Sequence, residues 1–164
     1  MAQFDEAAFS AFHGSHARAL WSYVYRVTGN SADADDIVQE AFLRLLRSGP
    51  DGDDEHRRRF LYRVASNLVV DRWRRKKRED RDDARPAAVQ STSPREPDDD
   101  LAKTFAELSP RDRALLWLAY VEGETHHEIA ASLGVGTRSI KVLLFRARRR
   151  LRDLLHAKGV SRTR

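Results

Sequence analysis

Residues 122–150, EGETHHEIAASLGVGTRSIKVLLFRARRR, decide the fold of the second half of the chain. Thr125 and Glu128 have the Thr-x-x-Glu spacing of a capping box, which satisfies the free amides that begin a helix. Gly134 follows the last apolar position and can adopt the left-handed backbone of a tight turn. A short, capped helix that ends in a glycine turn is therefore predicted.

A second helix is predicted directly after this turn. Its apolar face consists of residues at helical spacing, namely Ile140, Leu144, Ala147 and Leu151. The basic residues fall outside that face: Arg138, Lys141, Arg146, Arg148 and Arg149. Such a face suits a phosphate backbone, and the two helices have the layout of a helix-turn-helix DNA reader. An ordinary solvated helix would need neither the capped first helix nor the turn.

Composition limits the remaining possibilities. The chain has 164 residues, 41% of them hydrophobic, which is enough for one ordinary domain or two small ones. No apolar run approaches the roughly 20 residues of a membrane span, and the first residues lack the positive charge of an export signal. The absence of cysteine excludes disulfides and thiolate metal sites and agrees with a reducing compartment. We expect a soluble, cytoplasmic protein.

Residues 79–100, EDRDDARPAAVQSTSPREPDDD, separate two parts of the chain. Three of the five prolines fall there, and Val89 is the one sizeable apolar side chain. A loop of this length inside a compact domain is uncommon, so a flexible acidic linker is the better interpretation. We therefore predict a first domain over 1–78, a linker over 79–100, a second domain over 101–158 and a tail over 159–164.

Both domains are predicted to be all-helical, because apolar residues recur at helical spacing and no sustained strand alternation occurs. The first domain has three predicted apolar faces: Phe9, Phe12, Leu20, Val24 and Val27; Ile37, Val38, Ala41, Phe42, Leu45 and Leu46; and Phe60, Val64 and Leu68. In the second domain Ser109 and Pro110 suit the N-cap and first position of a helix whose face holds Leu115, Leu116 and Ala119.

Two features of the first domain have both a structural and a functional interpretation. Asp36, Gln39, Glu40 and Leu43 form a stripe away from the apolar face, which could be solvated or could contact a partner. In residues 60–78, FLYRVASNLVVDRWRRKKR, aromatic residues alternate with cations. The aromatic rings of Phe60, Tyr62 and Trp73 could belong to the core or could stack on unpaired bases.

Three segments, in this order, resemble bacterial sigma factors of the extracytoplasmic-function (ECF) class. They are DIVQEAFLRLL (36–46), YRVASNLVVDRWRRKKR (62–78) and LSPRDRALLWLAYVEGETHHEIAASLGVGTRSIKVLLFRARRRL (108–151). The resemblance covers nearly all of the chain outside the linker. It implies that the first domain docks on the clamp helices of the largest RNA polymerase subunit and opens the minus-ten promoter element. It also implies that the second domain reads the minus-thirty-five element and touches the flap of the other large subunit.

The resemblance assigns roles to particular residues. The family's Asp-x-x-Gln-x-x-Phe pattern falls on Asp36, Gln39 and Phe42, which makes the stripe a polymerase contact that also includes Glu40. Asn67, Asp71 and Arg74 fall on the family's strand-opening signature. The expected minus-ten contacts are Asn67, Asp71, Arg72, Trp73, Arg74, Arg75, Lys76 and Lys77.

The recognition helix departs from the family pattern. Many relatives have Gly-Thr-Val-Lys-Ser-Arg where this chain has Arg-Ser-Ile-Lys-Val-Leu over 138–143. Apolar groups there would suit thymine methyls better than hydrogen-bonding base edges. The expected minus-thirty-five contacts are Arg138, Ser139, Lys141, Val142, Phe145 and Arg146.

The resemblance implies no enzymatic activity, no cofactor or metal, no small-molecule substrate and no membrane insertion. Its expected partners are core RNA polymerase, promoter DNA and an anti-sigma factor. A stand-alone operator-binding regulator would need a dimer to read two half-sites, and no dimerisation segment is evident. A metal-dependent enzyme is suggested only by His126-His127-Glu128, but a metalloprotease motif would require histidine where Ala131 stands.

Overall fold

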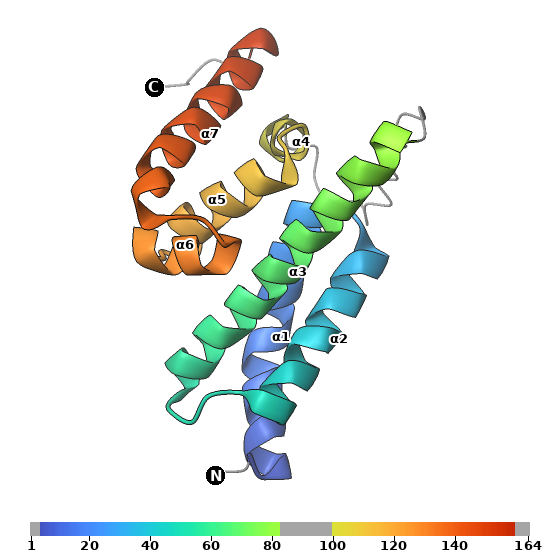
Figure 1. Cartoon of the computed structure of the whole chain (residues 1–164), viewed down its shortest axis with the longest axis vertical. Helices are drawn as coiled ribbons and strands as arrows, with labels where there is room; N and C mark the ends of the chain where they lie inside the picture. The colour runs from blue at the N-terminus through green and yellow to red at the C-terminus, as the bar shows by residue number, and fades with distance from the viewer. Residues whose placement is uncertain (1–3, 83–99, 160–164) are drawn as a thin grey trace. The chain divides into compact units, whose positions relative to one another are not determined.

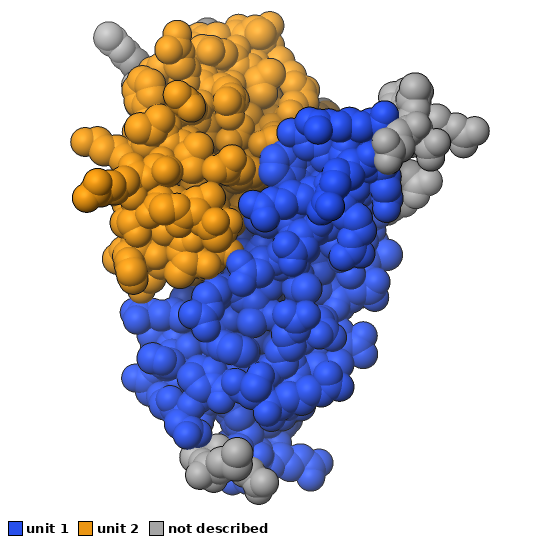
Figure 2. Space-filling view, in the orientation of Figure 1, with its two compact units in different colours: residues 1–90 blue, residues 91–164 orange. Residues whose placement is uncertain are grey.

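The computed structural model describes residues 4–82 and 100–159. The chain divides into two compact units, residues 1–90 and 91–164, which Figure 2 distinguishes by colour. Across the described ranges the secondary structure consists of seven α-helices (Figure 1). The all-helical prediction is therefore confirmed.

The first unit is a bundle of α1 (Glu6–Thr28), α2 (Ser31–Ser48) and α3 (Asp54–Asp82), and each helix contacts the other two (Figure 1). Local chemistry sets the ends of the helices. The Asp5 side chain caps α1, and Asn30 caps α2 by accepting a hydrogen bond from the Asp33 amide at 3.0 Å. Between them Gly29 has a φ of 68°, the left-handed conformation that ends α1 and allows the chain to reverse.

The core of this bundle contains aliphatic and aromatic side chains and a buried hydroxyl pair. Leu20 and Val24 of α1, Ile37 of α2 and Leu61 of α3 are fully buried. The Tyr23 hydroxyl lies 2.7 Å from the Ser66 hydroxyl in this interior, which satisfies both groups without water.

Two of the predicted apolar faces in the first domain were partly wrong. Leu46 is 50% exposed, although its spacing placed it in the core. In α3 the buried stripe is Leu61, Ala65 and Val69, one residue after the predicted Phe60, Val64 and Leu68. The broad buried face of α3 covers both α1 and α2, so the predicted stripe lies at its edge, with Phe60 and Leu68 half-buried and Val64 buried.

The second unit contains α4 (Asp100–Ala106), α5 (Pro110–Tyr120), α6 (His126–Leu133) and α7 (Thr137–Ala157). The predicted caps are present: Ser109 accepts a hydrogen bond from the Asp112 amide, and Thr125 and Glu128 form the reciprocal capping box. Helix α7 contacts α4, α5 and α6, and the sequence did not predict α4.

The described helices extend into both ends of the predicted linker. Helix α3 continues through Asp82, four residues past its expected end at Arg78, and α4 already begins at Asp100. The remainder of the predicted linker lies outside the described residues.

Candidate functional site

The predicted polymerase stripe forms one continuous face of α2. Gln39 and Glu40 lie three and four residues after Asp36 and four and three residues before Leu43, so the four side chains share a side of the helix. Asp36 and Gln39 are exposed, and Glu40 is half-buried with a hydrogen bond from Arg44 at 2.9 Å. The stripe therefore offers carboxylate and amide groups to a partner, with Leu43 extending it at 36% exposure.

Phe42 lies in the core beneath the stripe. It is 5% exposed, and its ring packs against Phe9, Phe12 and His13 of α1, with the His13 ring centroid 4.6 Å away. A shallow groove of about 350 Å³ lies beside the stripe, bordered by Gln39, Leu43 and Leu46. Phe42 thus acts as a core residue that fixes the position of the exposed groups.

The predicted strand-opening residues divide between two sides of α3. Asn67, Asp71 and Arg74 follow at intervals of four and three, and all three are exposed on one side. Arg75 and Lys77 are exposed as well. The exposed surface is therefore mainly cationic and also contains the neutral amide of Asn67 and the carboxylate of Asp71.

Phe60, Tyr62 and Trp73, which the sequence allowed either in the core or in contact with bases, differ in their burial. Tyr62 is 1% exposed and its ring lies 5.5 Å from that of Tyr23, so it belongs to the core. Phe60 and Trp73 are half-buried. The ammonium of Lys77 lies 5.3 Å from the Trp73 ring centroid, so this ring has a cation beside it.

Arg72 and Lys76 have acidic partners on α2. The Arg72 guanidinium lies 2.8 Å from Oδ1 of Asp33 and 4.0 Å from Oδ2 of Asp36. The Lys76 ammonium lies 3.4 Å from the other oxygen of Asp33. The sequence predicts both cations as DNA contacts, and no pattern in it indicates Asp33.

The helix-turn-helix has the predicted geometry. Gly134 has a φ of 66° and ends α6, and Gly136 is the N-cap of α7. Ile129, Leu133 and Ile140 are buried where the two helices meet. The predicted contact residues of α7 are all exposed: Arg138, Ser139, Lys141, Val142, Phe145 and Arg146.

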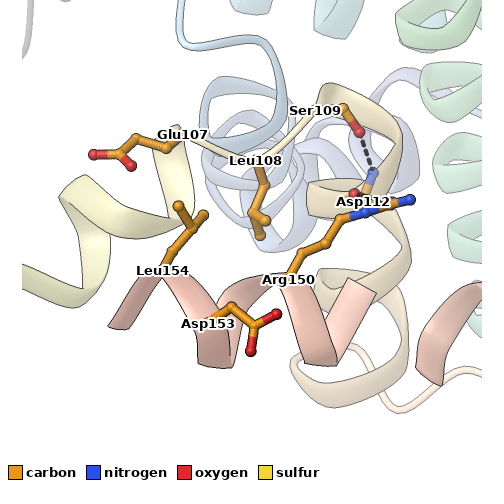
Figure 3. A pocket seen from close by; sticks show the side chains of 7 residues that line it. All are labelled: Glu107, Leu108, Ser109, Asp112, Arg150, Asp153 and Leu154. Carbon is orange, nitrogen blue, oxygen red and sulfur yellow. Dashed lines mark hydrogen bonds and ion pairs between the residues drawn. The ribbon is translucent and has the colours of Figure 1, made fainter. Parts of the chain in front are cut away.

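Two arginines further along α7 contact other residues of the second domain. Arg150 reaches from α7 to Asp112 of α5, with the guanidinium 2.7 Å from the carboxylate, beside a pocket of about 450 Å³ (Figure 3). Asp112 is 5% exposed, so this pair connects a buried carboxylate to an exposed cation. Arg148 donates a hydrogen bond to the Tyr120 hydroxyl at 2.9 Å.

One further cation is buried in the second domain. Burial lowers the pKa of Arg113 to about 10, which leaves it protonated at neutral pH. Its Nε donates a hydrogen bond to the Leu108 carbonyl at 3.0 Å, so the charge supports the start of α5.

The described residues contain no group of three or more histidine or acidic side chains placed to hold a metal ion. His126 and His127, which suggested a metal site in the sequence, are exposed at the start of α6. Within these ranges no helix is long and apolar enough to span a membrane.

Comparisons with known proteins agree with this geometry. Residues 12–79 match the family model of sigma-70 region 2, and residues 98–151 match that of sigma-70 region 4. The ECF RNA polymerase sigma factor SigL of Mycobacterium tuberculosis is 32% identical, over 96% of this chain and 94% of its own length. The chain belongs to the ECF RNA polymerase sigma factors. As a sigma factor it directs RNA polymerase to promoters through regions 2 and 4 and is not itself an enzyme.

Two further relatives support this assignment. The ECF sigma factor SigE of Mycolicibacterium smegmatis is 33% identical over 97% of this chain, which spans 66% of the length of SigE. The structure of CnrH in complex with the cytosolic domain of CnrY is similar with a TM-score of 0.63 and 27% identity, covering 93% of this chain and 90% of that one. Each of the two matched regions lies within one of the two structural units of this sigma factor.

Proposed function

We propose that region 2 of this sigma factor binds core polymerase through Asp36, Gln39 and Glu40, with Phe42 packed beneath them. The observation that supports this is a continuous exposed polar stripe on a helix whose other side is firmly packed. In the ECF class this surface docks on the clamp helices of the largest subunit. The same domain then opens the minus-ten element with the half-buried Trp73 and the exposed face of α3, which consists of Asn67, Asp71, Arg74, Arg75 and Lys77.

Region 4 reads the minus-thirty-five element with the first turns of α7. Arg138, Lys141 and Arg146 suit phosphates or guanine edges, whereas Val142 and Phe145 offer apolar surface at 49% and 53% exposure. Exposed apolar side chains on a cationic helix are suited to thymine methyl groups. This domain also touches the flap of the other large subunit.

An anti-sigma factor is the expected regulator, and the cytoplasm, where RNA polymerase works, is the expected compartment. The CnrH structure is a complex with CnrY, so a relative of comparable fold is bound by a second protein. A stand-alone operator-binding regulator is the second hypothesis from sequence. The match to region 2 in residues 12–79 disfavours it, since such a regulator has no use for a polymerase-binding domain.

Substitution of Asp36 by Arg and, separately, of Gln39 by Ala tests the polymerase surface. Both variants should lose affinity for core polymerase, because each removes an exposed contact and the first places a cation against a basic partner. Affinity is measured by competition with the unmodified chain, and circular dichroism checks the fold. Asp51→Arg, in the exposed turn between α2 and α3, is the matched charge reversal and should compete normally. Unchanged competition by both stripe variants would contradict the assignment.

A further inference from the structure

Asp33 forms an interhelix charge cluster with Arg72, Lys76 and Asp36. It is the third residue of α2, where the Asn30 side chain caps the helix and the dipole favours a negative charge. One of its carboxylate oxygens meets Arg72 at 2.8 Å, and the other meets Lys76 at 3.4 Å. The Asp33 side chain is 22% exposed, so its carboxylate is largely withdrawn from solvent.

The two cations continue the packed side of α3 beyond its last buried residues, where Arg72 is half-buried and the Lys76 side chain is 61% exposed. Arg72 and Lys76 follow the buried residues Leu61, Ala65 and Val69 at helical spacing, beyond the point where the apolar stripe ends. They therefore point toward α2, whereas Asn67, Asp71 and Arg74 occupy another side. Helix geometry brings Arg72 and Lys76 to Asp33 and away from the strand-opening face.

The Arg72 guanidinium has a second carboxylate within reach. Asp36 lies one turn after Asp33 and 4.0 Å from Arg72, yet its side chain remains 67% exposed. Arg72 is closer to Asp33 by more than 1 Å, so Asp33 is its principal partner. If Asp33 lost its charge, Asp36 would be the nearest remaining anion, and pairing with Arg72 would occupy the carboxylate that we assign to polymerase.

We propose that Asp33 is a positioning residue that pairs with Arg72 and Lys76 and thereby limits the pairing of Arg72 with the Asp36 carboxylate and of both cations with DNA phosphates. This rests on the proposed polymerase role of Asp36 for the first effect but not for the second. Region 2 would thereby keep the Asp36 carboxylate available to polymerase and leave DNA binding to the other exposed cations of α3.

A rescue experiment in the full-length chain tests the first effect. Asp33→Asn should weaken competition for core polymerase several-fold, and the double variant Asp33→Asn, Arg72→Gln should recover to within about twofold of the unmodified chain, because the competing cation is gone. Asp54→Asn is the matched control, since it also removes a first-turn aspartate paired with an arginine, at 3.4 Å from Arg57. Asp33→Glu, which keeps the charge, should compete normally.

The double variant is decisive. If Asp33 had a purely structural role, the additional Arg72→Gln change would not restore the binding to polymerase that Asp33→Asn weakens. A double variant as weak as Asp33→Asn would overturn this part of the proposal. If Asp36→Arg and Gln39→Ala leave polymerase binding unchanged, the proposed stripe itself is wrong. If those two variants weaken binding and Asp33→Asn does not, the stripe stands and Asp33 has no such role.

The salt dependence of binding to nonspecific duplex DNA tests the second effect without polymerase. Lys77→Gln should reduce the slope of log affinity against log salt by about one unit, as expected for a lost phosphate contact, whereas Lys76→Gln should leave it unchanged. Both lysines are exposed, so neither change threatens the fold. Equal reductions by Lys76→Gln and Lys77→Gln would show that Asp33 does not withhold Lys76 from DNA.

Discussion

At the scale of single residues, similar side chains of α3 have different surroundings. Tyr62 is buried against Tyr23, while Trp73 is half-buried beside the Lys77 ammonium. A ring that is partly exposed and has a cation beside it can stack on an unpaired base, because the cation holds the neighbouring phosphate. Trp73 is therefore the aromatic residue of α3 best placed to take part in strand opening.

Changing Trp73 to Ala should reduce open complex on duplex promoters more than on templates that carry a pre-melted bubble. The reason is that stacking of the ring on an unpaired base offsets the free energy needed to unstack that base from the duplex. In a pre-melted bubble the bases are already unpaired, so this contribution matters less. Permanganate reactivity of thymines measures the open complex. Equal losses on both templates would move Trp73 to a structural role in the bundle.

At the scale of elements, both long basic helices are anchored by an aspartate in the third position of another helix. Asp33 of α2 holds Arg72 of α3, and Asp112 of α5 holds Arg150 of α7. In each case the aspartate belongs to a capped first turn, where its charge is favoured. The arginines of a basic helix therefore divide into those that bind within the domain and those available to DNA.

Adjacent arginines on α7 provide a direct comparison. Arg150→Ala should lower the free energy of unfolding by about 1–3 kcal/mol, because it leaves the buried Asp112 carboxylate unpaired. Arg149→Ala should leave stability nearly unchanged and flatten the salt dependence of DNA binding by about one unit. Thermal unfolding and salt titration measure the two effects. If Arg149→Ala and Arg150→Ala change stability equally, or change the salt dependence equally, the proposed difference between these two arginines is wrong.

Replacing residues 139–143 with the Thr-Val-Lys-Ser-Arg of relatives should change the preferred upstream promoter sequence. The exposed Val142 would give way to a hydrogen-bonding side chain, and each good base contact contributes roughly 1–3 kcal/mol of discrimination. Selection from a library of promoter variants measures the preference. An unchanged ranking of sequences would show that this part of α7 does not read bases.

The features predictable from sequence were those set by near neighbours in the chain. The capping box at Thr125, the cap at Ser109 and the left-handed Gly134 each depend on residues within a few positions. The buried stripe of α3 was misplaced because a helix that packs against two partners has a broad apolar face with ambiguous edges. The Asp33–Arg72 pair joins residues 39 positions apart, and no local pattern reveals such a contact.

At the scale of the whole molecule, the sigma factor consists of two compact units that each carry a cationic surface. A small basic domain by itself binds duplex DNA mainly through phosphates, with little sequence preference. When a single partner binds both domains, the second contact becomes intramolecular and its effective concentration rises. Promoter selection is therefore expected to depend on core polymerase.

Transcription from fragments of the source genome, with core polymerase and the purified chain, tests the central claim most directly. The account predicts that sequencing the transcript ends will reveal start sites that require the chain and share upstream and minus-ten elements. Asp36→Arg should abolish these start sites while Asp51→Arg retains them. Start sites that are the same with and without the chain, or that persist with Asp36→Arg, would contradict the account.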